Sequence, residues 1–118
     1  MERVLVVDDE LDICVLLSKY LQKFGADTDY ALSVPDAITK ASNENYTLFI
    51  IDLNLSGGSG YDLIEKLRDM ELDTKIIMIS AHDGEAENAI HHGADYFVAK
   101  PLSKNSINKA LEHIHFKD

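Results

Sequence analysis

The amino-acid sequence predicts a doubly wound α/β domain, in which a parallel five-stranded sheet has helices on both faces. Continuous apolar runs such as Leu-Phe-Ile-Ile at 48–51 are typical of strands that are buried on both faces. Segments with helical periodicity separate these runs, and this alternation favours right-handed crossovers into a parallel sheet. With 118 residues, the chain is expected to form one domain, 1–118, around a single core.

The first half of the chain is expected to contain three strands, at 3–7, 26–31 and 47–52. Two helices are expected between them, one over 11–24 and one that Ser33 caps. The strand at 26–31 is polar, which is typical of a sheet edge, whereas the other two are mainly apolar.

The second half is expected to contain strands at 75–80 and 96–100, and helices at 60–70, at 83–92 and after the cap Ser103. The helix at 83–92 has only Ala86, Ala89 and Ile90 as an apolar face, so it is expected to be the most weakly packed. For five strands we expect the flavodoxin-like order 2-1-3-4-5 with five helices. This order places a binding crevice between strands 1 and 3.

Composition excludes several classes of protein. The formal net charge of -10 argues against direct binding to nucleic acid or to an anionic membrane, because phosphates require clustered Lys and Arg. No apolar run approaches the ~20 residues of a membrane span, and the N-terminus lacks the hydrophobic region of a signal peptide. The single cysteine, Cys14, is expected to be a buried packing residue, which suits a reducing compartment. We therefore expect a soluble, cytoplasmic protein.

Polar side chains follow the strands of the predicted sheet where each strand ends. Asp8 and Asp9 follow the first strand, Asp52 ends the third, Ser80 the fourth and Lys100 the fifth. Adjacent strands lie ~4.8 Å apart, so the carboxylates of strands 1 and 3 can approach within about 5 Å. At an effective dielectric constant near 20, two charges at that distance repel by roughly 3 kcal/mol. These acids therefore need either a shared proton or a divalent cation.

Magnesium is the cation that suits this cluster best. It takes one or two carboxylates, keeps several waters and bridges to phosphate groups. With the charge screened, Asp52 could attack phosphorus to form an acyl phosphate, while Lys100 neutralises the phosphoryl oxygens and Ser80 donates a hydrogen bond.

These residues resemble the receiver domain of two-component response regulators. The resemblance covers essentially the whole chain and rests on four motifs at four strand ends: Asp8-Asp9, Asp52, Ser80-Ala81 and Lys100-Pro101. Each motif alone is weak, but their order and their positions at the strand ends make the match specific.

The resemblance implies a phospho-acceptor and a magnesium site. Asp52 would accept the phosphoryl group and help to hold Mg²⁺. Asp9 would ligate the ion directly, Asp8 mainly through water, and the carbonyl of Asn54 would complete the site. The domain would not be an enzyme beyond catalysing its own phosphorylation and dephosphorylation.

The resemblance also implies a switch and partners. Ser80 and Lys100 would contact the phosphoryl group, Phe97 would be a rotating switch aromatic, and the Lys100-Pro101 bond would be cis. A sensor histidine kinase or a phosphotransfer protein would donate the phosphoryl group. The face formed by 83–116 would bind an output protein or a second copy of the chain.

Two positions depart from the family pattern in the loop after the acceptor. Ser56 stands where proline is usual, and Ser59 stands where an acid is common. The glycines at 57–60 match neither dinucleotide-binding nor P-loop spacing, so we expect a flexible loop there rather than a phosphate cradle.

Two other function classes remain open at this point. A haloacid-dehalogenase-like phosphatase has its nucleophile after the first strand and a second acid two residues later. In this chain, Asp8 is instead followed directly by Asp9 and Glu10. A flavodoxin-like cofactor binder should have Ser, Thr and Gly in the first loop rather than acids. Turnover of a phosphomonoester, or a yellow purified protein, would favour one of these alternatives.

Overall fold

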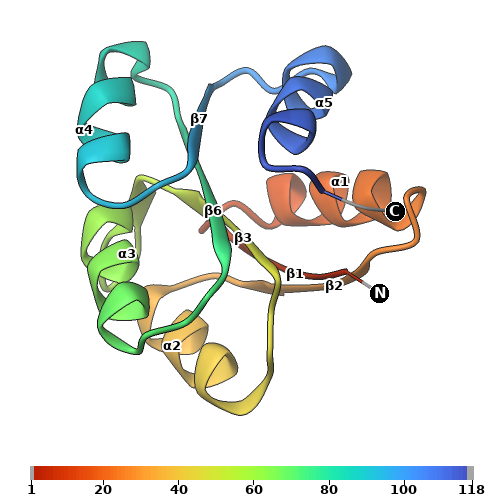
Figure 1. The fold of residues 1–118 in the computed structure, drawn as a ribbon. Helices are drawn as coiled ribbons and strands as arrows, with labels where there is room; N and C mark the ends of the chain where they lie inside the picture. Colours follow the sequence, from red (N-terminus) through yellow and green to blue (C-terminus); the bar gives the residue numbers. More distant parts are fainter. Residues whose placement is uncertain (1, 117–118) are drawn as a thin grey trace.

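The computed structural model describes residues 2–116 and contains the predicted parallel sheet (Figure 1). Its strands are β1 (Arg3–Val7), β2 (Asp27–Ala31), β3 (Leu48–Asp52), β6 (Lys75–Ser80) and β7 (Tyr96–Ala99). The strands lie in the order β2-β1-β3-β6-β7, and every neighbouring pair is parallel. Since β6 and β7 are the fourth and fifth strands of this sheet, the expected 2-1-3-4-5 order is confirmed.

The helices cover both faces of the sheet, as Figure 1 shows. They are α1 (Leu11–Gln22), α2 (Val34–Asn43), α3 (Gly60–Asp69), α4 (Ala86–His91) and α5 (Lys104–His113). One core lies between the sheet and α1 and α5, and a second lies between the sheet and α2, α3 and α4. Side chains alternate between them, so Ile50 belongs to the first core and Ile51 to the second. Among the helices described for residues 2–116, none has the length and apolar character needed to cross a membrane.

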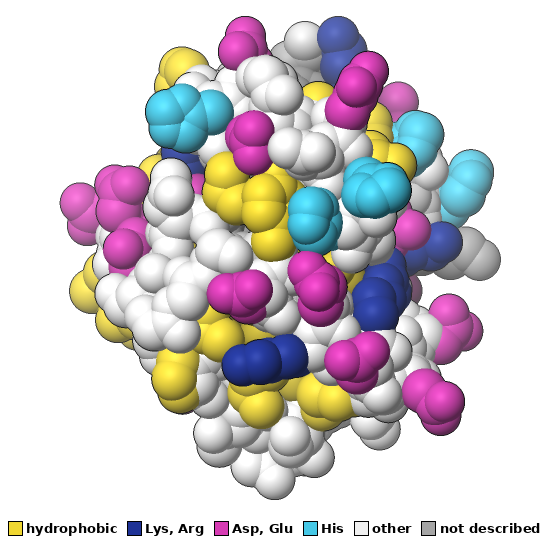
Figure 2. Space-filling view, turned by 90° about the vertical axis from the view of Figure 1, so that its left-hand side faces the viewer, with side chains coloured by type: hydrophobic (Ala, Val, Ile, Leu, Met, Phe, Trp, Pro, Cys, Tyr) yellow, Lys and Arg dark blue, Asp and Glu magenta, His cyan; other side chains and the backbone are white. Residues whose placement is uncertain are grey.

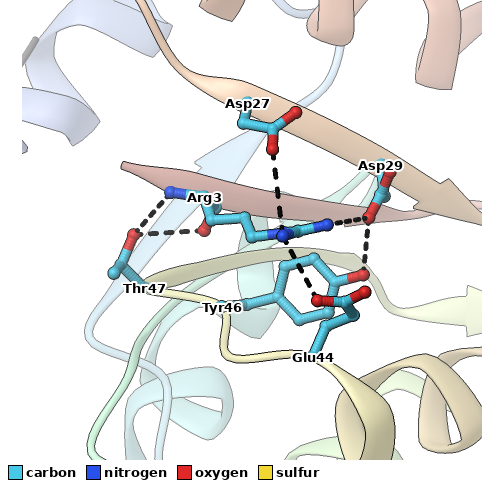
Figure 3. A network of polar contacts seen from close by, with 6 residues as sticks. All are labelled: Arg3, Asp27, Asp29, Glu44, Tyr46 and Thr47. Atoms are coloured by element: carbon cyan, nitrogen blue, oxygen red, sulfur yellow. Dashed lines mark hydrogen bonds and ion pairs between the residues drawn. The ribbon is translucent and has the colours of Figure 1, made fainter. Parts of the chain in front are cut away.

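A polar network joins the amino ends of β1 and β2 to the loop before β3 (Figure 3). The Arg3 guanidinium lies 3.4 Å from a carboxylate oxygen of Asp29 and 3.2 Å from one of Glu44. Tyr46 is buried beneath it and donates a 2.7 Å hydrogen bond from its hydroxyl to Asp29. A single exposed ion pair contributes little to stability. Here, however, the ion pairs share the Arg3 guanidinium, which lies over the buried ring of Tyr46. The network therefore fixes the edge of the sheet opposite to the predicted site.

The helix expected at 83–92 differs in form. It begins as a 3-10 helix, η1 (Asp83–Glu85), and continues as the six-residue α4. No side-chain hydrogen bond caps either segment. Ala89 is fully buried, but Ile90 is 50% exposed. This segment therefore gains little from packing, as its thin apolar face predicted.

The segment after Asp52, expected to be a flexible loop, forms a small hairpin instead. The two-residue strands β4 (Asn54–Leu55) and β5 (Gly58–Ser59) pair antiparallel around a turn in which Gly57 has a φ of 82°. A β-bridge joins Ser33 to Ser56, and the Ser56 carbonyl accepts a 3.1 Å hydrogen bond from the backbone at the start of α2. These contacts restrain a loop that lacks the proline usual in the family.

Gly60, the first residue of α3, cannot take a side chain without a shift of the backbone. A Cβ atom there would lie 2.5 Å from the Asp52 carbonyl oxygen and 2.9 Å from the Leu53 Cα. We expect Gly60→Ala to lower the free energy of unfolding by about 1–3 kcal/mol, measured by urea denaturation. Gly84→Ala is the control, since a Cβ atom there meets nothing within 4 Å. Equal midpoints for both variants would contradict this requirement for glycine.

Candidate functional site

The carboxyl ends of β1, β3 and β7 bring two acids and a lysine together. The Nζ of Lys100 lies 3.2 Å from an Asp8 carboxylate oxygen and 3.3 Å from one of Asp52. Asp8 is fully buried, and Asp52 is only 5% exposed. The parallel pairing of the apolar strands sets this arrangement. The carboxyl ends of the strands lie at one edge of the sheet, so the polar residue at each end lies at that edge.

Burial controls the protonation of this site. Removal from water, reinforced by the charge of Asp8, raises the pKa of Asp52 to about 6, although Lys100 opposes the shift. Burial likewise raises the pKa of Asp8. For Lys100, burial alone would lower the pKa, but attraction to Asp52 and Asp8 outweighs it and the pKa is raised. The lysine therefore stays charged, whereas both acids ionise less readily than ordinary carboxyl groups.

Oxygen ligands for a cation gather beside this pair. Carboxylate oxygens of Asp8, Asp9 and Glu10 all lie within 4.8 Å of one another. Asp9 and Glu10 are exposed, whereas Asp8 is buried and accepts a 2.9 Å hydrogen bond from the Glu10 backbone. Hard oxygen donors that are partly open to water fit Mg²⁺, which retains part of its hydration shell. Asn54, whose carbonyl is the remaining ligand that the resemblance implies, lies in β4.

Glu10 is the residue of this site that the sequence analysis did not select. Its carboxylate lies 3.6 Å from the Lys100 Nζ, so it is a third acid facing the same ammonium group. Its position directly after Asp9 was the available signal.

Ser80 at the end of β6 and Phe97 in β7 face other partners. Ser80 is fully buried, and its Oγ accepts a 3.0 Å hydrogen bond from the backbone N–H of His82. Its carbonyl accepts a 2.7 Å bond from the Lys100 backbone, which aligns the ends of β6 and β7. Phe97 is half-buried against the core beneath α2, α3 and α4. The Lys100-Pro101 peptide bond that follows is cis, as expected.

Cys14 lies directly beneath the site. It is fully buried, and its thiol donates a 3.4 Å hydrogen bond to the Asp8 carbonyl oxygen. Burial raises the pKa of this thiol to about 11, so it stays protonated at neutral pH. Its expected role as a packing residue is confirmed.

Comparison with known proteins agrees with this geometry. A family model described as the response regulator receiver domain matches residues 4–112. The chain belongs to the response regulator receiver domains. This membership favours a signalling module over the phosphatase and cofactor-binding alternatives.

Curated relatives and solved structures agree with the assignment. The receiver domain is 32% identical to the alkaline phosphatase synthesis transcriptional regulatory protein PhoP of Bacillus subtilis, covering 96% of this chain and 48% of PhoP. It is 34% identical to the acid tolerance regulatory protein ActR of Rhizobium meliloti, covering 92% of this chain and 57% of ActR. The chain thus spans about half the length of these relatives.

Among solved structures, the response regulator TrrA of Thermotoga maritima, in complex with Mg²⁺-BeF, superposes with a TM-score of 0.86. It is 32% identical, and the match covers 95% of this chain and 97% of TrrA. The chemotaxis response regulator CheY4 of Vibrio cholerae shares the fold, with a TM-score of 0.90 over 97% of this chain and 98% of CheY4, at 24% identity.

The raised pKa of Asp52 makes its ionised form a destabilising element in magnesium-free buffer. The folded state binds the proton more tightly than the unfolded chain, so stability should fall as pH rises from the ordinary value of 3.8 through about 6. We expect Asp52→Asn to be more stable than wild type by roughly 2 kcal/mol above pH 7 in EDTA. The advantage should vanish well below the ordinary pKa of 3.8, because Asp52 is then protonated in both the folded and the unfolded state of wild type. Urea denaturation across this pH range measures it, and a constant difference would contradict the assignment of the shift.

Proposed function

We propose that residues 1–118 form one receiver domain that is phosphorylated on Asp52, with Mg²⁺, in the cytoplasm. The donor is a sensor histidine kinase or a phosphotransfer protein, and the modification alters the 83–116 face that binds an output partner. The supporting observation is the buried Asp52 carboxylate, 3.3 Å from the Lys100 ammonium group at the open edge of the sheet. A buried acid beside a lysine on a strand end is suited to accept a phosphoryl group.

The reaction requires Asp52 in its ionised form. A carboxylate oxygen of Asp52 attacks phosphorus, an O–P bond forms, and the N–P bond of the donor phosphohistidine breaks. The electron pair of that bond stays on the imidazole nitrogen, which takes up a proton. Lys100 neutralises charge on the transferred group, and the Ser80 hydroxyl, whose oxygen accepts from the His82 backbone, donates its own hydrogen to that group. The domain acts only on itself and is not an enzyme for other substrates.

Asp8, Asp9, Asp52 and the carbonyl of Asn54 would hold the magnesium ion, with Glu10 beside them. When bound, the ion supplies positive charge that keeps the acids ionised and compensates the phosphoryl oxygens. The TrrA structure, solved in complex with Mg²⁺-BeF, supports magnesium as the ion.

An apolar surface on α1 suits the docking of the phosphodonor. Leu11, Val15 and Leu16 are 47%, 37% and 58% exposed, and α1 begins one residue after Glu10 at the site edge. A groove of about 210 Å³ continues this surface between Leu16 and the start of α5, and its lining is mainly apolar. A donor helix packed here would present its histidine to Asp52. This position favours the phosphodonor over other partners as the occupant.

The output signal would pass from Ser80 to the 83–116 face. Attraction of the Ser80 hydroxyl to the phosphoryl group vacates space beside β6, and Phe97 turns inward to fill it. The weakly packed η1–α4 segment can then shift. The acidic net charge of the chain favours another protein, or a second copy of this chain, as the partner that binds the switched face.

Phosphorylation of Asp52 should depend on Mg²⁺. Incubation with acetyl phosphate and Mg²⁺ is expected to add one phosphoryl group by intact mass, and EDTA is expected to prevent it. Asp52→Asn should gain none, whereas Asp9→Ala should need a higher Mg²⁺ concentration because one ligand is lost. Modification of the Asp52→Asn protein under the same conditions would refute the acceptor assignment.

The docking surface can be separated from the chemistry. Leu16→Lys is expected to slow transfer from a phosphohistidine donor at least tenfold, because a buried apolar contact at an interface is replaced by a charge. Transfer from acetyl phosphate should be unchanged. Ile90→Lys, on the exposed side of α4, is the matched control and should leave both rates unchanged. Equal loss with both phosphodonors would place the defect in the site rather than at the surface.

A further inference from the structure

Tyr61 of α3 contacts the η1–α4 segment at two positions. It lies in the first turn of α3, and its hydroxyl donates a 2.7 Å hydrogen bond to the Glu85 carboxylate in η1. Its ring stacks on His92, the C-cap of α4, with ring centroids 4.2 Å apart and planes inclined by 21°. Figure 2 shows the α3–α4 side, where histidine, acidic and hydrophobic side chains intermingle on the surface. One side chain thus contacts the segment where η1 meets α4 and again at the end of α4.

These contacts matter because the segment has few others. Ala89 is its buried side chain, and neither η1 nor α4 has a side-chain cap. A single hydrogen bond to a charged group is therefore a large fraction of what holds η1 in place.

The two ends of the segment are held differently. Beyond α4, the Arg68 guanidinium of α3 donates to the Gly93 carbonyl at 2.7 Å and to an Asp95 carboxylate oxygen at 3.2 Å. Asp95 in turn accepts a 2.8 Å bond from the Ile76 backbone. The C-terminal end of α4 is therefore fixed by several charged contacts, whereas the Tyr61–Glu85 bond alone among the described side-chain hydrogen bonds ties η1 to α3.

The same N-terminal end is connected to the phosphorylation site. The buried Ser80 hydroxyl accepts from the backbone of His82, which is the N-cap of η1. Gly60, next to Tyr61, packs on the backbone of Asp52. A movement of Ser80 therefore pulls on one side of η1 while Tyr61 restrains the other.

We propose that Tyr61 is a positioning residue whose hydrogen bond to Glu85 latches η1–α4 in the resting arrangement. The latch opposes the rearrangement that phosphorylation of Asp52 drives, and so it sets how much of the unmodified domain occupies the switched state. The inference rests on the proposed function, because it assumes that η1–α4 moves when Asp52 is modified.

The test removes only the hydroxyl. Tyr61→Phe keeps the ring and its stack on His92, while Glu85→Ala removes the acceptor and Glu85→Gln keeps an acceptor oxygen. Glu87→Ala, an exposed acid of α4 without this contact, is the matched control. Each protein is studied with Mg²⁺ alone and with Mg²⁺ and beryllofluoride, which mimics the acyl phosphate. Amide exchange over 82–93 and the apparent affinity for beryllofluoride are measured.

Loss of the latch should raise amide exchange over 82–93 in the unmodified protein about three- to tenfold. By linkage, it should also tighten beryllofluoride binding by a similar factor, because the mimic binds the switched state. Tyr61→Phe and Glu85→Ala should act alike, the double variant should add nothing further, and Glu85→Gln should retain most of the restraint. A merely structural role for Tyr61 would weaken the fold without tightening binding.

Two results would overturn the inference, and they are distinguishable. If wild type responds to beryllofluoride over 82–93 but Tyr61→Phe binds the mimic no more tightly, the latch is wrong and the proposed function stands. If wild type neither binds beryllofluoride nor changes its exchange, the proposed function fails and the latch fails with it.

Discussion

One ammonium group faces more carboxylates than it can neutralise, and the rest of this domain is arranged around that imbalance. Lys100 contacts Asp8, Asp52 and Glu10, and the first two are almost completely buried. Because their repulsion acts away from water, neither salt nor solvent screens it effectively. The residual negative charge makes this edge receptive to a cation. The pairing of the strands maintains this cluster of acids, since it fixes the register in which the strands end.

The sequence was sufficient to predict this edge because topology places the residues concerned. A strand with an apolar run such as 48–51 must be buried on both faces, so helices must cover both sides of the sheet that contains it. Once the strand order follows from the alternation with helices, the residue that ends each strand has a known neighbour. Asp8, Asp52 and Lys100 are therefore brought together by backbone pairing, with little dependence on side-chain detail.

Other features depend on contacts between side chains or on short-range backbone choices, which periodicity does not encode. The hairpin after Asp52 is held partly by a bridge from Ser33 to Ser56, which are distant in sequence. The 3-10 form of η1 follows from a segment that has neither a cap nor a substantial apolar face. The bond from Tyr61 to Glu85 joins two elements whose separation is set only by the completed fold. Residues that act through such contacts were not visible in the sequence pattern.

The sheet also divides the interior, with a consequence for how such a domain can diversify. Ile50 and Ile51 are adjacent in the chain, yet they pack into different cores. A substitution beneath α1 and α5 therefore removes no direct side-chain contact beneath α2, α3 and α4. Side chains of the two cores can therefore vary separately in evolution, because the backbone of the sheet lies between the two packing layers.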